Sequence, residues 1–403
     1  YQKVGILDGR EGNNPWLQEL PDPVTKATWD NYLVISPQTA RDNDLVTGMI
    51  VILQSANGML ELPVLIQPGT DFKTVGLAVG YGRSVAGKIG MGVGVNAYPF
   101  QAFIDGTKQG LLAVEIKKTG KKRELALTQT HHSMEGRSII KETTLQEYLK
   151  DPNAGNENHH APISMWSGHD QKGHQWAMMI DLTKCTGCSG CIISCSAENN
   201  VPVVGQIEVL RRREMHWLRL DRYYQGDEKN PKVVFMPVMC QHCDNAPCET
   251  VCPVLATVQS TDGLNQQVYN RCVGTRYCAN NCPYKVRRFN WFDYPHDDKY
   301  QNMALNPDIV VRSRGVMEKC SLCVQRIQEG KLEAKKQGRA LQEADIKTAC
   351  QQSCPANAIM FGDLNDPKSS VAKFLKNPRN YKLLEELNVR PRVSYLTKVR
   401  NAE

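Results

Sequence analysis

Fifteen cysteines are the side chains of this sequence best suited to hold a metal centre, and all of them lie between Cys185 and Cys354. They form four groups along the chain, which are Cys185, Cys188, Cys191 and Cys195; Cys240, Cys243, Cys248 and Cys252; Cys272, Cys278 and Cys282; and Cys320, Cys323, Cys350 and Cys354. In the third group, Thr275 stands where the spacing of the first group has a cysteine. An odd number of cysteines argues against a complete set of internal disulfides.

The spacing within the groups predicts iron–sulfur clusters. Each iron of a cubane cluster takes one thiolate, so three cysteines on one tight loop can bind three irons, and the fourth cysteine of the group binds another cluster. We expect that fourth cysteine to begin a helix, because Pro253, Pro283 and Pro355 follow it in three groups and proline fits a first helical turn. Structural zinc sites usually have two separated ligand pairs, and disulfides do not favour triplets, so both are weaker alternatives.

Crossed ligation divides the cysteines into four predicted sets, because the two outer groups exchange fourth ligands with each other and so do the two inner groups. The sets are set A, Cys185, Cys188, Cys191 and Cys354; set B, Cys320, Cys323, Cys350 and Cys195; set C, Cys240, Cys243, Cys248 and Cys282; and set D, Cys252, Cys272 and Cys278. Sets A, B and C are each expected to bind the iron of one [4Fe–4S] cluster.

Set D has three thiols, and Thr275 faces the corner that lacks a ligand. Threonine is a poor ligand for iron at neutral pH because its hydroxyl stays protonated. We therefore expect a [3Fe–4S] cluster in set D. The alternative is a [4Fe–4S] cluster with water or hydroxide on the fourth iron.

The charge of the chain is consistent with buried anionic clusters. Its formal net charge is +7 when every cysteine is counted as a neutral thiol. Four bound clusters would add roughly −8, at about −2 each, so no nucleic-acid partner is predicted. Lys285, Arg287 and Arg288 closely follow Cys282 and are placed to offset cluster charge, whereas His242 is either a tuning residue or an ordinary loop side chain. No catalytic residue is predicted, because fully thiolate-ligated clusters transfer electrons rather than bind substrate.

Four segments are expected to position these residues. Residues 1–135 read as a β-barrel or sandwich, with strands at 33–35, 49–53 and 60–66, a hairpin at Asn57-Gly58, and a short helix capped by Ser36. Residues 136–172 read as a linker, 173–368 as the cysteine domain, and 369–403 as a docking tail whose apolar residues have helical spacing. No apolar run of about 18 residues is present, so no membrane-spanning helix is predicted.

Two regions of the sequence resemble known families. Residues 176–364 resemble the four-cluster electron-transfer subunits that accompany molybdopterin oxidoreductases, and residues 22–100 resemble the last domain of molybdopterin enzymes. The motifs that carry these resemblances are Trp29-Asp30-Asn31, Ile35-Ser36-Pro37, Gly80-Tyr81-Gly82-Arg83 through Asn96-Ala97-Tyr98-Pro99, Thr130-His131-His132, Arg219 to Tyr224, and Gly362 to Pro367. Together they resemble the iron–sulfur subunit of bacterial alternative complex III, a quinol-oxidising respiratory assembly.

This resemblance implies an α+β fold, in which a double-psi β-barrel precedes two stacked ferredoxin-like units. It implies a subunit without its own substrate site, which passes electrons from quinol through four clusters toward cytochrome c haems. The implied partners are an integral-membrane quinol-binding subunit and multihaem and monohaem cytochrome c subunits. The implied location is the periplasmic face of the inner membrane, where the subunit would be peripheral.

The resemblance also implies that the molybdopterin-like part is structural, so no molybdenum is expected. Because the chain begins at Tyr1 rather than at Met, we expect it to be part of a longer product. One alternative is the C-terminal part of an active molybdopterin oxidoreductase with its electron-transfer module. Another is a scaffold in which the metal centres only hold the fold together.

Overall fold

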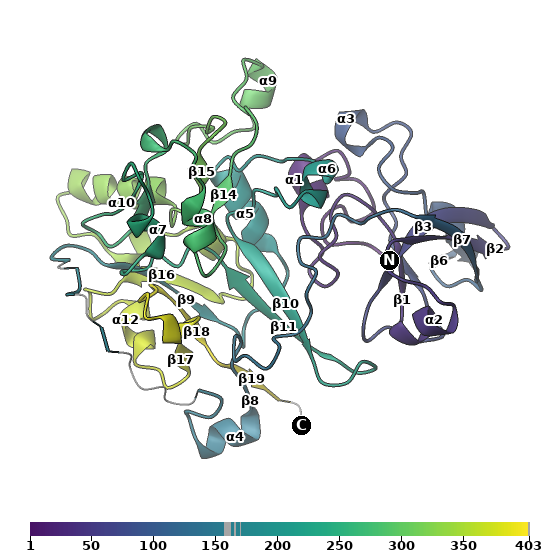
Figure 1. Ribbon diagram of the computed structural model, residues 1–403, viewed down its shortest axis with the longest axis horizontal. Coiled ribbons are helices and arrows are strands. Elements are labelled where there is room, and N and C mark those ends of the chain that lie inside the picture. Colours follow the sequence, from purple (N-terminus) through teal and green to yellow (C-terminus); the bar gives the residue numbers. More distant parts are fainter. Residues whose placement is uncertain (157–162, 165–166, 170, 402–403) are drawn as a thin grey trace. The chain divides into compact units, whose positions relative to one another are not determined.

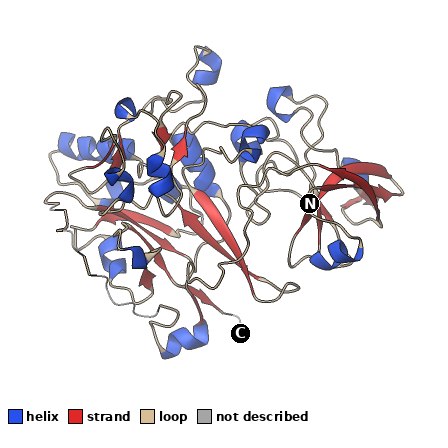
Figure 2. Cartoon of the chain, viewed as in Figure 1, coloured by secondary structure: helices blue, strands red, loops and turns tan. Residues whose placement is uncertain are grey.

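The computed structural model describes residues 1–403 except 157–162, 165–166, 170 and 402–403. The described residues divide into two compact units. Unit 1 comprises Tyr1–Ser133, Val203–Glu214 and Arg222–Val234, and unit 2 comprises Met134–Pro202, Met215–Asp221 and Phe235–Glu403. Both contain strands and short helices joined by long loops (Figure 2), so the expected α+β class is confirmed.

Unit 1 is built on a five-stranded mixed sheet with the order β4-β1-β3-β2-β7. Its strands are β1 (Leu33–Ile35), β2 (Met49–Ser55), β3 (Gly58–Ile66), β4 (Gly76–Leu77) and β7 (Glu115–Lys122), and β5 (Ala102–Ile104) pairs separately with β6 (Thr107–Gln109). Its helices are α1 (Pro15–Glu19), α2 (Pro37–Asp42), α3 (Gly87–Gly90), η1 (Tyr98–Phe100) and α6 (Gln206–Leu210). Strands β1 and β3 are parallel, whereas β2 is antiparallel to β3 and β7.

Local signals in the sequence explain much of this sheet. The Ser36 hydroxyl accepts a hydrogen bond from the Thr39 amide at 2.9 Å and caps α2, as expected. Ser55 pairs with Gly58 across the predicted hairpin. The alternating apolar residues of β1, β2 and β3 pack into one core, whose fully buried members are Leu33, Ile35, Val51, Leu53, Leu62 and Val64.

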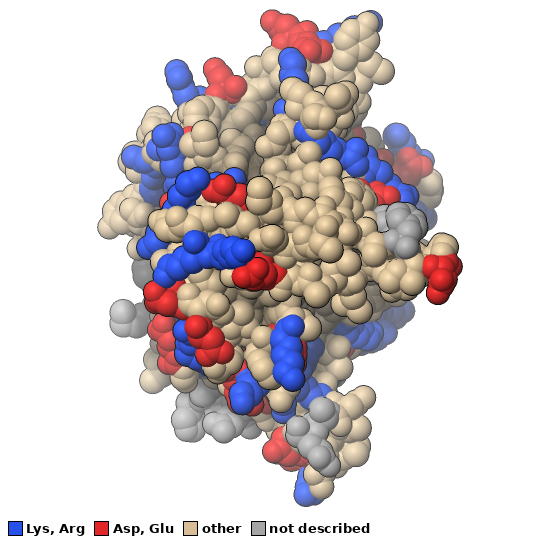
Figure 3. All heavy atoms as spheres, turned by 90° about the vertical axis from the view of Figure 1, so that its right-hand side faces the viewer, with Lys and Arg blue, Asp and Glu red and all other residues tan. Residues whose placement is uncertain are grey.

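Charged side chains of both signs alternate on the exposed surface of unit 1. Lysines of β7 form ion pairs with carboxylates, with Lys118 Nζ at 2.6 Å from Asp44 and Lys121 Nζ at 2.9 Å from Glu61. Figure 3 shows one face of the molecule on which blue and red groups lie close to each other around uncharged surface. These basic residues therefore have acidic partners within their own unit.

Unit 2 has a four-stranded sheet with the order β16-β9-β18-β17 (Figure 1). Its strands are β9 (Trp176–Asp181), β16 (Ile359–Asp363), β17 (Asn380–Tyr381) and β18 (Val393–Leu396); smaller pairs are β8 (Glu142–Thr144) with β19 (Lys398–Arg400), β12 (Thr257–Gln259) with β13 (Asn265–Gln267), and β14 (Arg288–Phe289) with β15 (Met317–Glu318). Strands β10 (Arg219–Gln225) and β11 (Lys232–Val238) pair with each other and have residues in both units.

The helices of unit 2 are short. They are α4 (Leu145–Lys150), α5 (Gly190–Glu198), α7 (Pro247–Thr250), η2 (Tyr269–Arg271), α8 (Tyr277–Asn281), α9 (Lys299–Asn302), α10 (Val324–Lys336), η3 (Glu343–Asp345), α11 (Ala349–Gln352), α12 (Ser370–Leu375) and η4 (Glu385–Leu387). None of the described helices is long and apolar enough to cross a membrane.

The end of the chain is less helical than its apolar spacing predicted. Helix α12 ends at Leu375, and Leu387 lies in η4 rather than in an α-helix. Strand β18 then pairs in parallel with β9, with Val393 opposite Met178. Pairing in the middle of a sheet buries the side chains of the strand and gives hydrogen-bond partners to its backbone N–H and C=O groups. In a helical docking segment, these groups would have bonded to each other within the helix.

Candidate cluster-binding sites

The four thiols of set A line one cavity. Cys185 and Cys188 come from the loop before α5, Cys191 from its first turn, and Cys354 from the turn after α11, more than 160 residues later in the chain. Ser189 lines the same cavity and is 2% exposed, and its hydroxyl has no hydrogen-bond partner among the described residues. Four thiols and one unpartnered donor suit a group that binds thiolates and accepts hydrogen bonds, so this site fits an iron–sulfur cluster.

Set B gathers thiols from three elements of unit 2. Helix α5 packs against α11, and this contact brings Cys195 toward Cys350. Burial raises the pKa of Cys195 well above its usual range, and the thiols of Cys320, Cys323 and Cys350 raise it further. Thiols gathered in this way ionise together only when a cation compensates them, and iron is such a cation.

Polar groups already point at the sulfur atoms of set B. The backbone amide of Leu322 donates to Cys320 Sγ at 3.4 Å, and the amide of Ala349 donates to Cys323 Sγ at 3.5 Å. The Asn199 side chain donates to Cys195 Sγ at 3.7 Å. Such donors stabilise negative charge on sulfur and thereby raise the reduction potential of a bound cluster.

Set C lies where α7 packs against α8. Cys248 belongs to α7, Cys282 directly follows α8, and Cys240 and Cys243 lie in the loop before α7. Burial raises the pKa of Cys248 to about 12, although the nearby Arg287 guanidinium opposes this increase. The thiols of Cys240, Cys248 and Cys282 all act on the pKa of Cys243, which burial raises well above its usual range.

Two of the three members of set D lie at the same pair of helices. Cys278 is buried in α8, and Cys252 comes two residues after α7. Cys272 Sγ accepts a hydrogen bond from the Met317 amide at 3.4 Å. Thr275 is exposed in the loop between Cys272 and Cys278. That these three thiols bind one cluster remains a prediction.

The three Cys-Pro pairs end helices rather than begin them, which corrects the expectation from the sequence. Helix α7 ends before Cys252, α8 ends before Cys282, and α11 ends before Cys354. A residue that precedes proline disfavours helical backbone, and the proline instead takes the second position of a turn. That turn aims an amide at the thiol, with Ala256 N at 3.2 Å from Cys252 Sγ and Ala358 N at 3.3 Å from Cys354 Sγ.

Three basic or ionisable side chains are buried among the sets, namely Arg287, His242 and Lys319, and only Arg287 was expected there from the sequence. For His242 the sequence left open a tuning residue and an ordinary loop side chain, and the structure buries it completely. Lys285 is exposed and Arg288 is half-buried, with its guanidinium donating to the His216 carbonyl at 3.1 Å. Lys319 was missed, although it is 1% exposed. Its position directly before Cys320 was the available signal, but lysines are rarely buried and the signal was weak.

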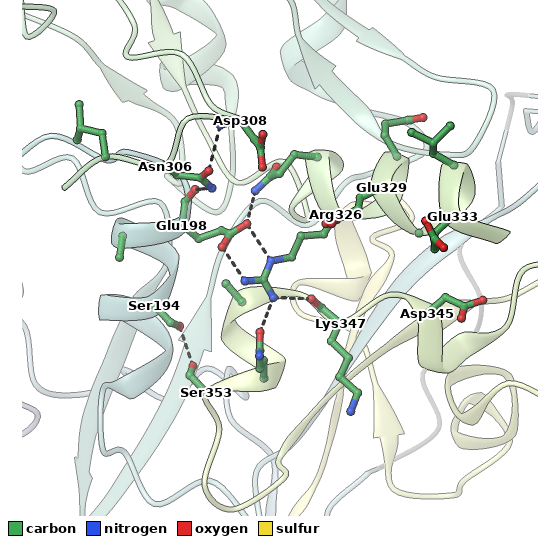
Figure 4. A pocket seen from close by; sticks show the side chains of 18 of the residues that line it. Ser194, Glu198, Asn306, Asp308, Arg326, Glu329, Glu333, Asp345, Lys347 and Ser353 are labelled. Carbon is green, nitrogen blue, oxygen red and sulfur yellow. Dashed lines mark hydrogen bonds and ion pairs between the residues drawn. The ribbon is translucent and has the colours of Figure 1, made fainter. Parts of the chain in front are cut away.

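A groove of unit 2 with a volume of about 1480 Å³ runs past the helices that carry Cys191, Cys195 and Cys350 (Figure 4). Its lining comes from α5, α10, α11 and residues 304–308, and no cysteine contributes to it. The Arg326 guanidinium pairs with Glu198 at 2.6 Å and donates to the Lys347 carbonyl at 2.9 Å. This groove is therefore a solvent-facing surface beside the thiols, and it is held by its own ion pairs.

All fifteen cysteines lie in the described part of the chain, and each is a free thiol. Among the described residues, no three His, Cys, Asp or Glu side chains converge closely enough for a single metal ion. That finding concerns mononuclear sites, since each thiolate of a polynuclear cluster binds a different iron.

Comparison with known proteins identifies the family. Two family models, each described as a 4Fe-4S dicluster domain, match this chain over residues 184–256 and 231–297. The iron–sulfur cluster-binding subunit of menaquinone reductase from Nitratidesulfovibrio vulgaris is 40% identical over 230 residues, which are 56% of this chain and 89% of that protein. Iron–sulfur subunit 1 of the Hdr-like menaquinol oxidoreductase from Archaeoglobus fulgidus is 34% identical over 239 residues, which are 55% of this chain and 82% of that protein.

The iron–sulfur subunit of arsenate respiratory reductase from Shewanella sp. is similar over much the same extent, with 29% identity over 248 residues, or 54% of this chain and 94% of that protein. These matches confirm iron–sulfur clusters as the cofactor class. They also agree with the gathering of thiols described above. The chain belongs to the family of iron–sulfur cluster-binding subunits of quinol and menaquinone oxidoreductases, which carry 4Fe-4S dicluster domains.

Proposed function

We propose that this chain is the electron-transfer subunit of a membrane-associated respiratory quinol oxidoreductase. It would pass electrons from quinol, oxidised in an integral-membrane partner, through three [4Fe–4S] clusters and one [3Fe–4S] cluster toward multihaem and monohaem cytochrome c subunits. The observation that carries this proposal is the cavity in which Cys354 joins Cys185, Cys188 and Cys191. Distant cysteines that meet around one cavity support crossed ligation, which is how neighbouring clusters are held close together.

The role of the protein is to bind, space and tune these centres. A bound cluster supplies one-electron chemistry. The thiols of sets A to D would hold the clusters, and backbone amides such as those of Ala256 and Ala358 donate to thiol sulfur. Most of these thiols are buried, so water is kept away from them and nearby charges act strongly on them.

The finer assignment is to the iron–sulfur subunits of alternative complex III. It is supported by the order of the two resemblances along the chain, with the molybdopterin-like region before the cysteine region. In this assignment residues 1–135 form a double-psi β-barrel without molybdenum, residues 136–172 a linker, residues 173–368 two stacked ferredoxin-like units, and residues 369–403 a docking tail. The protein would lie on the periplasmic face of the inner membrane.

EPR spectroscopy of the anaerobically purified full-length product, with iron and molybdenum analysis, tests this proposal. We expect a [3Fe–4S] signal in the oxidised protein, further [4Fe–4S] signals on stepwise reduction with dithionite, and no molybdenum. Stoichiometric molybdenum would instead support the C-terminal part of an active molybdopterin oxidoreductase. Zinc without iron, or metal centres that dithionite leaves unchanged, would overturn the electron-transfer proposal.

A further inference from the structure

Two buried cations lie between cysteine sets and have no carboxylate partner. Lys319 and Arg287 are 1% and 6% exposed, and neither forms an ion pair with Asp or Glu in the described part of the chain. Elsewhere in unit 2, the buried Arg312 pairs with Glu318 at 2.8 Å. The Glu249 carboxyl group acts electrostatically on both cations but forms an ion pair with neither. A buried charge without a full counter-charge is strongly unfavourable, so two buried cations beside one carboxyl group require a further source of negative charge.

Lys319 connects the loops of set B and set C. Its ammonium donates to the carbonyl of Cys320, a member of set B, at 3.0 Å, and to the carbonyl of Asn265. The side-chain oxygen of Asn265 lies 3.9 Å from the thiol of Cys248, a member of set C. The Lys319 side chain therefore bonds to a residue of set B and to a residue that contacts a thiol of set C.

His242 makes a second connection at the same place. Its Nδ1 accepts a hydrogen bond from the Asn265 amide at 3.1 Å, so the proton is assigned to Nε2, which donates to the Cys320 carbonyl at 3.1 Å. An imidazole that accepts a hydrogen bond at one ring nitrogen and donates from the other is neutral. Lys319 is thus the positive charge at this junction, and His242 is a hydrogen-bond bridge.

Arg287 occupies the corresponding place between set C and set D. The thiols of Cys248 and Cys240 in set C and of Cys278 in set D lie near its guanidinium. Its Nε and Nη1 are buried and have no hydrogen-bond partner among the described residues. Its remaining polar contacts are neutral, with Thr257 Oγ1 at 2.7 Å and with the side-chain oxygen of Gln267.

We propose that Lys319 is the counter-charge shared by the clusters of sets B and C, and that Arg287 is the counter-charge shared by those of sets C and D. A cluster becomes more negative when it is reduced, so a buried cation nearby stabilises the reduced form and raises the potential. Each cation acts on two neighbouring clusters and raises the potentials of both. This inference rests on the proposed electron-transfer function and adds the residues that set its potentials.

Redox titration of the purified complex, monitored by EPR, tests this assignment through the variant Lys319→Met. This change removes the charge and keeps the length of the side chain. We expect the reduction potentials of two [4Fe–4S] clusters to fall by about 59 mV each. For a one-electron step, this is a tenfold fall in the ratio of reduced to oxidised cluster at a given applied potential. The third [4Fe–4S] potential and the [3Fe–4S] potential stay unchanged. Lys335→Met, which changes an exposed lysine of α10, is the matched control and moves no potential.

Arg287→Met is expected to lower a different pair, namely the [3Fe–4S] potential and one [4Fe–4S] potential that Lys319→Met also lowers. Unchanged potentials in either variant with a full iron content would overturn the proposal for that residue, and so would an equal shift of all four clusters. If Lys319→Met loses its clusters, Lys319→Arg must retain the iron and both potentials, and loss of iron there as well would mean that Lys319 is only structural. If the unsubstituted complex contains no redox-active iron, the proposed function fails instead.

Discussion

Two loops of the cysteine region turn at the same positions but carry different ligands. The loop of the first group carries Cys185, Cys188 and Cys191, and the loop of the third group carries Cys272, Thr275 and Cys278. Gly187 has φ +75° and Gly274 has φ +72°. Two positions later, the backbone is again left-handed in both loops, with φ +64° at Ser189 and +62° at Arg276. A helix begins directly afterwards in each loop. Cys188 and Thr275 therefore occupy equivalent positions, and both are exposed. The two loops thus present a cysteine and a threonine between the same two left-handed positions.

The two loops differ in the helices that come after them. Helix α5 continues past Cys195 to Glu198, whereas α8 ends at Asn281, directly before Cys282. Pro283 explains the difference, because the residue before a proline disfavours helical backbone. The comparison teaches that backbone geometry and ligand identity are separable in this chain. Cluster type is then expected to depend on a single side chain.

The largest effect is expected from exchanging that side chain. Thr275→Cys supplies the missing thiolate to a loop that already has the right geometry, so the [3Fe–4S] cluster should become a [4Fe–4S] cluster. The EPR signal of the oxidised protein should disappear and the iron content should rise by one atom per chain. Cys188→Thr makes the reverse change in the first loop, so a second [3Fe–4S] signal should appear and one iron should be lost.

Thr275→Ser is the control for the exchange, because it keeps a hydroxyl at this position and should leave the [3Fe–4S] signal in place. A [3Fe–4S] signal that persists in Thr275→Cys would contradict the equivalence of the two loops. It would mean that the vacant corner of set D does not face residue 275.

A smaller effect is expected from the glycines that shape the two loops. Alanine at φ near +70° costs about 1–2 kcal/mol. A Cβ at Gly274 would also lie 2.5 Å from the Gly315 carbonyl oxygen, which is backbone, whereas a Cβ at Gly187 would meet the ring of Phe235 at 2.5 Å. A ring can turn aside more easily than a backbone can move, so Gly274→Ala should lower the apparent melting temperature of the complex more than Gly187→Ala.

Gly338→Ala separates backbone strain from crowding, because Gly338 has φ +63° and open space around its missing Cβ. It should lower the melting temperature less than either loop variant. Equal effects of all three substitutions would show that crowding plays no part and that the close approach of Gly274 to Gly315 is unimportant.

The sequence predicted the chemistry of these loops better than their geometry. The Ser36 cap and the Asn57-Gly58 hairpin were predictable because they depend on neighbouring residues. The gathering of cysteines followed from their spacing. The pairing of β18 with β9 was not predictable, because it joins strands that are more than 200 residues apart and no local pattern specifies the partner of a strand.

The burial of Lys319 and the left-handed backbone of Ser189 and Arg276 were not predictable from the sequence either. Lysine and arginine are usually exposed, and a left-handed backbone is rarely taken by residues other than glycine, asparagine and aspartate. Tertiary contacts overrode these preferences around the thiols. The same deviations also occur in unit 1, where Lys26 is both buried and left-handed, so they do not mark a functional site by themselves.

The smallest effect is expected at Ser189, the residue at which the first loop differs from Arg276 in the third. The Ser189 hydroxyl is buried in the wall of the set A cavity without a partner among the described residues, so we expect it to donate to a sulfur atom of the bound cluster. Ser189→Ala removes that donor and should lower the potential of one [4Fe–4S] cluster by about 30–60 mV, a threefold to tenfold change in the ratio of reduced to oxidised cluster.

Ser194→Ala provides the matched comparison, because the Ser194 hydroxyl already bonds to the Ser353 hydroxyl at 2.7 Å and to the Cys191 carbonyl at 3.2 Å. It should leave all potentials unchanged in the same EPR titration. Arg276 should not substitute for the serine, since its guanidinium lies over the rings of Trp291 and Phe289, 4.7 Å and 5.1 Å from their centres. A fall in potential in Ser194→Ala but not in Ser189→Ala would place the cluster on the other side of α5 and contradict the assignment of set A.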